Sequence, residues 1–331
     1  MVENNTKDFP FISALLVTKD EQDYVEMSLM SLIDQSYPKS QYEIIVIDGG
    51  STDNTLVIVE NIRKKYSTGQ FSISVYNNPK KILAAGWNIG IKVAKGDYVI
   101  RIDAHAKASS NFLMESMKTM MEVDAECVGG KLQTKTLSGN NDTISKVLSS
   151  PFGVGNSSFR VSEKKGYVDT AVYGLYKKQV FNEVGYFNEK YARNQDLEMH
   201  SRIKKNGGRF YFNPKIKCDY YARNTTKKMA RQGFQNGVWN MVLLREDRSA
   251  LSLRHLVPFF FVLFLGCTAI GGIFNKYIRA AGISVLLFYF ALGIVFGIKS
   301  GAKGKEKIKM PFLFFLLHAS YGIGYLFGLF K

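Results

Sequence analysis

The sequence is poor in cysteine and proline, and each shortage limits what the protein can be. Its 331 residues include three cysteines, Cys127, Cys218 and Cys267, which lie far apart. Their odd number and wide spacing exclude a disulfide framework or a zinc site and fit a reducing compartment. Only 7 residues are proline whereas 46% are hydrophobic, so we predict a folded chain rather than a disordered one.

Several familiar motifs are also missing. The first ten residues, MVENNTKDFP, show no basic start followed by an apolar run, so we expect no signal peptide. No Gly-x-Gly-x-x-Gly opens the helix after the first predicted strand, and no Walker lysine loop is present. Dinucleotide-binding and P-loop enzymes are therefore not the first choice.

Acidic residues are few relative to basic ones. The sequence contains 28 Asp and Glu but 44 Lys and Arg, which gives a net charge of +16 at pH 7. Such an excess indicates nucleic acid, a phosphorylated ligand or an acidic membrane surface as partner. Residues 255–331 carry +7 of this charge and the rest of the chain +9. Because no recognition helix or aromatic and basic sheet signature is evident, nucleic acid is not expected as a partner.

Long hydrophobic runs, by contrast, are concentrated in the C-terminal part of the chain. Residues 256–274 and 280–298 contain no charge, and 311–330 is interrupted only by His318. As helices, these runs would span about 28 Å, close to the ~30 Å hydrocarbon core of a bilayer. We predict a membrane domain over 255–331 with two to three transmembrane helices. The glycines and polar groups of the third run would also suit a re-entrant or interfacial segment.

The loop between the second and third runs sets the expected orientation. Residues 299–310 carry five lysines and one acid, so the positive-inside rule predicts that this loop is cytoplasmic. Two crossings separate the loop from the residues before 256, which places those residues in the cytoplasm as well. We therefore expect a multi-pass protein of the cell membrane with a cytoplasmic catalytic domain.

The first part of the chain alternates strand-like and helix-like segments. Such alternation predicts parallel strands with right-handed crossovers, and ligands bind at the carboxyl ends of the strands in sheets of this kind. Acidic residues follow three of the four predicted strands, and a divalent cation between carboxylates could hold a diphosphate there. The predicted strands cover 11–17, 43–47, 72–76 and 98–102, and the predicted helices cover 22–35 and 82–94.

Four ordered segments carry a family resemblance. They are VTKDE at 17–21, IIVIDGGSTDNT at 44–55, ILAAGWNIGIKVAKGDYVIRIDAHA at 82–106 and YARNQDLEMHSRI at 191–203. Together they resemble the family 2 glycosyltransferases, and within them the membrane-attached glucosyltransferases of succinoglycan-type exopolysaccharide assembly. The resemblance implies an α/β, Rossmann-like fold of the GT-A type over residues 1–222. Its nucleotide-binding half would cover about 10–125 and its acceptor half about 126–222.

The resemblance also implies the substrates and the metal. The enzyme would move a hexose, with inversion, from a nucleotide-sugar donor of the UDP-sugar type to a polyprenyl-diphosphate-linked sugar. Asp103 and His105 stand where the family has Asp-x-Asp, and their oxygen and nitrogen can turn toward one divalent cation, Mn²⁺ or Mg²⁺. The positions expected to contact the nucleotide are Thr18, Glu21, Asp48, Asn88 and Asp103. Helix capping remains the alternative for Thr18 and Glu21, as it does for Asp53, and a surface position remains the alternative for Asn88.

An inverting transfer needs a base for the acceptor hydroxyl. Asp196 matches the base of the family's Glu-Asp motif, with Gln195 where Glu is common. Glu198 is the fallback candidate. Arg202 is either a helix-surface cation or a partner of the base or the product diphosphate, and the resemblance implies that Asp169 lies on the acceptor side.

Residues 223–254 are predicted to form an interfacial amphipathic helix region. The stretch 225–244 mixes basic and aromatic side chains, as helices at a membrane surface do, although a core helix of the catalytic domain is an alternative. The Gln-x-x-Arg-Trp motif of processive synthases is absent, which favours a single addition over polymerisation. Two other functions stay open, a polyprenyl-phosphate glycosyltransferase and a non-enzymatic membrane scaffold.

Overall fold

The computed structural model describes residues 9–135, 142–155, 157–221 and 225–331. Contacts divide the chain into two compact units. The first comprises Met1–Gln133, Ser162–Gln195 and Met199–Tyr220, and the second comprises Thr134–Val161, Asp196–Glu198 and Tyr221–Lys331.

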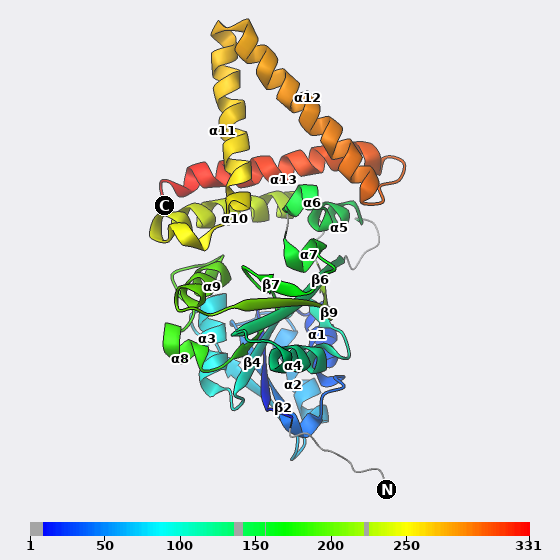
Figure 1. Cartoon of the computed structure of the whole chain (residues 1–331). Helices are drawn as coiled ribbons and strands as arrows, with labels where there is room; N and C mark the ends of the chain where they lie inside the picture. Colours follow the sequence, from blue (N-terminus) through cyan, green and yellow to red (C-terminus); the bar gives the residue numbers. More distant parts are fainter. Residues whose placement is uncertain (1–8, 136–141, 156, 222–224) are drawn as a thin grey trace. The chain divides into compact units, whose positions relative to one another are not determined.

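The first unit is built on a nine-stranded mixed sheet (Figure 1). Its parallel part consists of β1 (Ile12–Thr18), β2 (Tyr42–Asp48), β3 (Ile73–Asn77) and β4 (Tyr98–Asp103). These strands agree with the predicted ranges to within one residue, which confirms the α/β prediction. The other strands are β5 (Ala106–Ala108), β6 (Cys127–Lys135), β7 (Gly166–Val168), β8 (Leu175–Lys177) and β9 (Phe210–Tyr221). The order across the sheet is β3-β2-β1-β4-β8-β6-β9-β5, and β7 pairs with β9.

Helices of the first unit connect and cover these strands. They are α1 (Val25–Ile33), α2 (Thr55–Tyr66), α3 (Leu83–Val93), α4 (Phe112–Glu122), α8 (Val180–Val184) and most of α9 (Gln195–Lys205), whose residues Asp196–Glu198 belong to the second unit, with a short 3₁₀ turn, η1, at Lys39–Gln41. Helix α3 agrees with the predicted range 82–94, and Gly90 lets it approach the sheet. A Cβ on Gly90 would lie 2.9 Å from side-chain atoms of Leu15 and Ile47, so a larger residue would push the helix away.

The register of the parallel strands brings their carboxyl ends to one edge. Thr18 of β1 lies opposite Asp48 of β2, and Asp48 lies opposite Asn77 of β3. On the other side of β1, Val17 lies opposite Asp103 of β4. Helical crossovers leave β1 toward β2 on one side and reach β4 on the other, so β1 and β4 form the switch point at which open α/β sheets bind ligands.

The second unit is helical. Three of its helices are long and apolar enough to cross a membrane, namely α11 (Leu253–Phe274), α12 (Lys276–Lys299) and α13 (Glu306–Gly328). The helix predicted at 225–244 is α10 (Thr226–Glu246). The remaining helices are α5 (Asp142–Ser149), α6 (Pro151–Val154), α7 (Ser158–Val161) and the 3₁₀ turn η3 (Arg248–Ala250).

A segment from the middle of the chain is anchored in the second unit. Phe152 of α6 stacks on Phe296 of α12 and meets the ring of Phe314 of α13 edge-on. His318 of α13 contacts the carbonyl oxygen of Gly153 through Nε2 at 3.3 Å. These contacts join α6 to α12 and α13 through one aromatic cluster.

Candidate active site

Asp103 ends β4 and is held from two sides. Its Oδ2 accepts a hydrogen bond from the Tyr173 hydroxyl at 3.0 Å, and its carbonyl oxygen accepts one from Ser28 of α1 at 3.1 Å. Burial and the neighbouring Asp103 raise the pKa of Tyr173 well above its usual value, so this hydroxyl stays protonated and donates. The carboxylate therefore remains an acceptor at the sheet edge.

Tyr173 is a site residue that the sequence analysis did not single out. It lies in the loop before β8 with a φ of 46°, a left-handed conformation that is uncommon for an aromatic residue, and its side chain is buried. Strained backbone of this kind gathers at functional sites, where surrounding contacts enforce it. The local sequence gives no sign of it, because its partner Asp103 lies 70 residues earlier in the chain.

His105 forms a pair with Glu21. The Nδ1 atom of His105 lies 3.1 Å from Oε1 of Glu21, and the Tyr220 ring meets the imidazole edge-on at 5.1 Å between centroids. Glu21 is only 8% exposed, and its backbone N–H donates to Oγ1 of Thr55 at 2.8 Å. The carboxylate that we expected at the nucleotide thus contacts the imidazole that we expected at the metal.

The loops after β1 and β2 are joined by reciprocal hydrogen bonds. Oδ1 of Asp20 accepts from the backbone N–H of Thr52 at 2.8 Å, and Oε1 of Gln22 accepts from that of Asn54 at 3.1 Å. In return, Gln22 donates its own N–H to Asp53 at 3.2 Å. The helix predicted over 22–35 is present as α1 (Val25–Ile33), but its predicted start is three residues too early, since these loop contacts occupy 20–22.

Asp48 stabilises the turn that follows β2. Its Oδ2 accepts from the backbone N–H groups of Gly50 and Ser51 at 2.9 and 3.0 Å, and its Oδ1 accepts from the Ser51 hydroxyl at 2.5 Å. Gly50 has a φ of 76°, which glycine adopts without strain. Beside this turn, the buried Oγ1 of Thr18 has no hydrogen-bond partner within the described residues. Thr18 thus keeps a polar group available at the edge.

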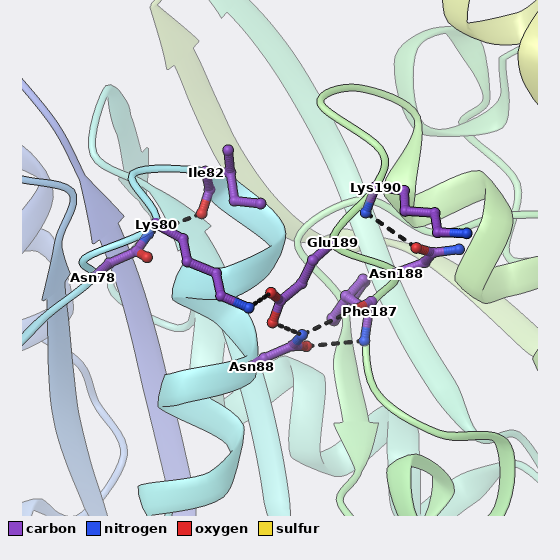
Figure 2. A network of polar contacts seen from close by, with 8 residues as sticks. All are labelled: Asn78, Lys80, Ile82, Asn88, Phe187, Asn188, Glu189 and Lys190. Atoms are coloured by element: carbon purple, nitrogen blue, oxygen red, sulfur yellow. Dashed lines mark hydrogen bonds and ion pairs between the residues drawn. The ribbon is translucent and has the colours of Figure 1, made fainter.

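Asn88 is engaged within the protein (Figure 2). Its amide donates to the carbonyl oxygen of Phe187 at 2.9 Å and to Oε1 of Glu189 at 3.0 Å, and its Oδ1 accepts from the N–H of Phe187. Glu189 in turn pairs with Lys80 at 2.5 Å. Only 5% of Asn88 is exposed, so it is not the surface residue of our alternative, and these bonds fix α3 to the segment after α8.

Asp196 lies in the first turn of α9. The helix follows Asn194, whose φ is 60°, and Oδ1 of Asp196 accepts from the N–H of Leu197 at 3.0 Å. One turn later, His200 bonds through its two ring nitrogens to the hydroxyls of Thr170 and Tyr176, each at 2.7 Å. Burial, with Arg101 nearby, holds the pKa of His200 well below its usual value, so the ring stays neutral.

Arg202 of α9 has a structural role. Its guanidinium donates to the carbonyl oxygens of Val184, Gly185 and Tyr186, at 3.2 Å to Gly185 and 2.8 Å to Tyr186. These carbonyls belong to the C-terminal end of α8 and the loop that follows it. The suggested contact of Arg202 with a product diphosphate therefore finds no support in its observed hydrogen bonds.

The donor set at the sheet edge fits a divalent cation shared with a substrate. No group of three or more His, Cys, Asp or Glu residues with metal-site spacing occurs among the described residues. Asp103 and His105 would supply one oxygen and one nitrogen, and diphosphate oxygens and water would complete the shell. The Glu21 carboxylate at Nδ1 is the outer partner that a metal-binding imidazole usually has.

Solved structures with a similar fold are glycosyltransferases. One is a mannosyltransferase from Pyrobaculum calidifontis in complex with GDP-Man and Mn²⁺, with a TM-score of 0.63, 15% identity and coverage of 96% of this chain and 87% of that one. Another is TarS of S. aureus with UDP, with a TM-score of 0.51, 14% identity and coverage of 96% and 90%. These likenesses confirm the GT-A fold.

Sequence comparison defines the family. Residues 13–185 match glycosyl transferase family 2. A dolichyl N-acetyl-alpha-D-glucosaminyl phosphate 3-beta-D-2,3-diacetamido-2,3-dideoxy-beta-D-glucuronosyltransferase of Methanococcus voltae is 31% identical over 97% of this chain and 98% of its own length. The succinoglycan biosynthesis protein ExoA of Rhizobium meliloti is 25% identical over 72% of each chain. The chain belongs to glycosyltransferase family 2 and is a glycosyltransferase.

Proposed function

We propose that the protein transfers a hexose, with inversion, from a nucleotide-diphosphate sugar to a sugar linked through phosphate to a polyprenyl lipid. The observation that carries the proposal is the sheet edge at which Thr18, Asp48 and Asp103 end neighbouring strands, with Glu21 and His105 paired beside them. Such an edge is where an α/β sheet binds a nucleotide.

Asp103 and His105 would hold a divalent cation, Mn²⁺ or Mg²⁺, and the cation when bound would neutralise charge on the leaving diphosphate. Tyr173 keeps the Asp103 carboxylate in place by donating to Oδ2. Glu21, by accepting from Nδ1, would fix the tautomer of His105 that presents Nε2 to the cation. Asp48 and Thr18 would face the nucleoside.

Asp196 would take the proton of the acceptor hydroxyl as that oxygen attacks the anomeric carbon. Its position in the first turn of α9 leaves it half-buried, and buried neighbours such as Met199 and Ile203 anchor the same helix in the core. A carboxylate on an anchored helix can act as a positioned base.

The acceptor assignment rests on the relatives and on the apolar helices. The name of the Methanococcus relative specifies a dolichyl sugar phosphate as its acceptor. Three helices able to cross a membrane would keep this chain near such a lipid, with the transferase unit on the cytoplasmic face.

The test uses the full chain in purified membranes with a panel of UDP- and GDP-sugars. The acceptors are polyprenyl phosphate, a polyprenyl-phosphate sugar and a polyprenyl-diphosphate sugar. We expect transfer to a sugar-bearing lipid, and transfer to bare polyprenyl phosphate alone would contradict the proposal.

Asp196→Asn tests the base. We expect it to lower the transfer rate by about 10²–10⁴-fold, while nucleotide-sugar binding stays within about twofold of the unchanged protein. Glu198→Gln on the same helix is the matched control and should keep most of the activity. Near-normal turnover in Asp196→Asn would refute the assignment.

A further inference from the structure

Helix α13 is long and apolar enough to cross a membrane, yet its contacts within the second unit point to another placement. Among the three candidate helices it has the largest buried share, 39% of its most apolar window against 11% for α11 and 22% for α12. The helices that pack against α13 therefore indicate how deep in the membrane it lies.

The backbone of α13 runs along the backbone of α10. A Cβ on Gly237 of α10 would lie 2.0 Å from the carbonyl oxygen of Tyr321, and a Cβ on Gly328 of α13 would lie 2.6 Å from that of Val238. Asn240 of α10 donates to the Tyr325 hydroxyl at 3.0 Å. Glycines that let two backbones touch are typical of helix pairs packed in or on membranes, and this pair lies side by side in Figure 1.

Helix α10 is unsuited to cross a bilayer. Lys227, Lys228 and Arg231 are exposed at its start, and Arg245 and Glu246 are exposed at its end. The uncharged stretch between them, 232–244, would cover about 20 Å, short of the ~30 Å hydrocarbon core. A helix with charged ends and an apolar middle of this length lies at the membrane surface. Since α13 touches α10 along its backbone, both lie at the same depth.

The start of α11 and the second half of α12 lie next to α13. Tyr325 of α13 donates to the carbonyl oxygen of His255 at the start of α11, and Gly293 in the second half of α12 faces Pro311 of α13. The tip of the α11–α12 hairpin carries four apolar or aromatic side chains that are 66% to 86% exposed. These side chains are Ile270, Ile273, Phe274 and Tyr277. In Figure 1 the hairpin rises crosswise from α13.

The outer face of α13 is an apolar stripe. Its members are spaced by four, seven and four residues, which keeps them on one face, and each is at least 36% exposed. They are Phe312, Leu316, Ile323 and Phe327, and the exposed Phe330 follows just beyond the end of the helix at Gly328. At the N-terminal end of the helix, Lys303, Lys305 and Lys307 are exposed. An apolar stripe with adjacent lysines matches acyl chains below anionic headgroups.

We propose that α13 is an in-plane helix that pairs with α10 at an anionic membrane surface, so that α11 and α12 alone among the candidate helices cross the bilayer. The stripe from Phe312 to Phe327 contacts acyl chains. Lys331 then lies on the same side of the membrane as the lysine loop, whereas a crossing α13 would put it on the opposite side. This proposal is independent of the transfer reaction.

Single cysteines test the arrangement in the full chain. In a Cys267→Ser background, whose other cysteines are buried, Lys331→Cys is compared with Lys303→Cys in the lysine loop and Lys276→Cys at the hairpin tip. A membrane-impermeant maleimide is applied to intact cells and to inverted vesicles. We expect Lys331→Cys to label together with Lys303→Cys and from the side opposite to Lys276→Cys. Labelling of Lys331→Cys from the side of Lys276→Cys would overturn the proposal.

The depth of α13 in the bilayer provides a second measurement, which does not require a comparison of labelling from the two sides of the membrane. Nitroxides are attached at Phe312→Cys and Phe327→Cys in vesicles that contain phosphatidylglycerol, and their depth is measured by relaxation with oxygen and nickel reagents. The two positions are about 22 Å apart along the helix axis. We expect equal depths in one leaflet, and depths in opposite leaflets would overturn the proposal.

Discussion

The two units of the molecule place their polar side chains in different ways. In the first unit, Asp103, Glu21 and His105 lie at the edge of a sheet, with Glu21 and His105 paired. In the second unit, Asn240 pairs with Tyr325, and His318 pairs with Tyr289 at 2.7 Å, so that polar groups join one helix to another. These polar groups thus lie at a candidate ligand site in the first unit and between helices in the second. Four substitutions test this difference.

The largest effect is expected at Asp103. Asp103→Asn removes the charge that the strand end offers to a cation, and we expect transfer to fall by at least about 10³-fold. Asp97→Asn, at the exposed opposite end of β4, is the matched control and should leave activity unchanged. Steady-state kinetics at several Mn²⁺ concentrations measure both. An Asp103→Asn enzyme as active as Asp97→Asn would show that the sheet edge is not the site.

A smaller effect is expected from Glu21→Gln. Without its carboxylate, His105 loses the partner that orients its ring, so Mn²⁺ affinity should fall about 10–100-fold. Mn²⁺ binding in the presence of nucleotide, followed by electron paramagnetic resonance, reads this out apart from turnover. Glu26→Gln on the exposed side of α1 is the control. Unchanged Mn²⁺ affinity in Glu21→Gln would leave the carboxylate with a purely structural role.

In the second unit, Asn240→Leu should act on stability. The substitution leaves the Tyr325 hydroxyl without the Asn240 donor, which should lower the free energy of unfolding by about 1–2 kcal/mol. Thermal unfolding in lipid nanodiscs measures the loss, and Gln232→Leu on the same helix serves as the control. Equal melting temperatures would mean that glycine packing alone holds α10 and α13 together.

The smallest effect concerns pH. Because burial lowers the pKa of His200 in the folded chain, the unfolded chain takes up a proton more readily below its ordinary pKa of about 6.5. Unfolding should therefore become easier by up to about 1.4 kcal/mol per pH unit as pH falls below about 6.5. His200→Gln should make the stability profile flatter than that of the unchanged protein between pH 7 and 5. An unchanged slope would contradict a neutral His200.

Much of the first unit could be predicted from local pattern. Runs such as 43–47 are buried on both faces of a parallel sheet, so their apolar composition identifies them without tertiary information. The positions of Asp48 and Asp103 at strand ends follow from the same runs. The start of α1 could not be predicted, because Asp20 and Gln22 each bond to a residue 32 positions further along the chain.

Contacts between residues far apart in the sequence could not be predicted from local pattern either. Tyr173 lies 70 residues from Asp103, and Glu21 lies 84 residues from His105. Asn88 matched the family at a position that the structure uses to hold Phe187 and Glu189. A motif identifies a residue type at a position, but the hydrogen bonds that the side chain makes depend on what the fold brings next to it.

The sequence alone determined the α/β order of the first unit, the acidic strand ends and the presence of three apolar helices, since each follows from the period or length of a local run. Only the tertiary structure decided that Glu21 contacts His105, that Tyr173 donates to Asp103 and that α13 touches α10 through Gly237. The physical reason is that hydropathy records how apolar a helix is, whereas the depth at which it lies depends on the helix packed against it.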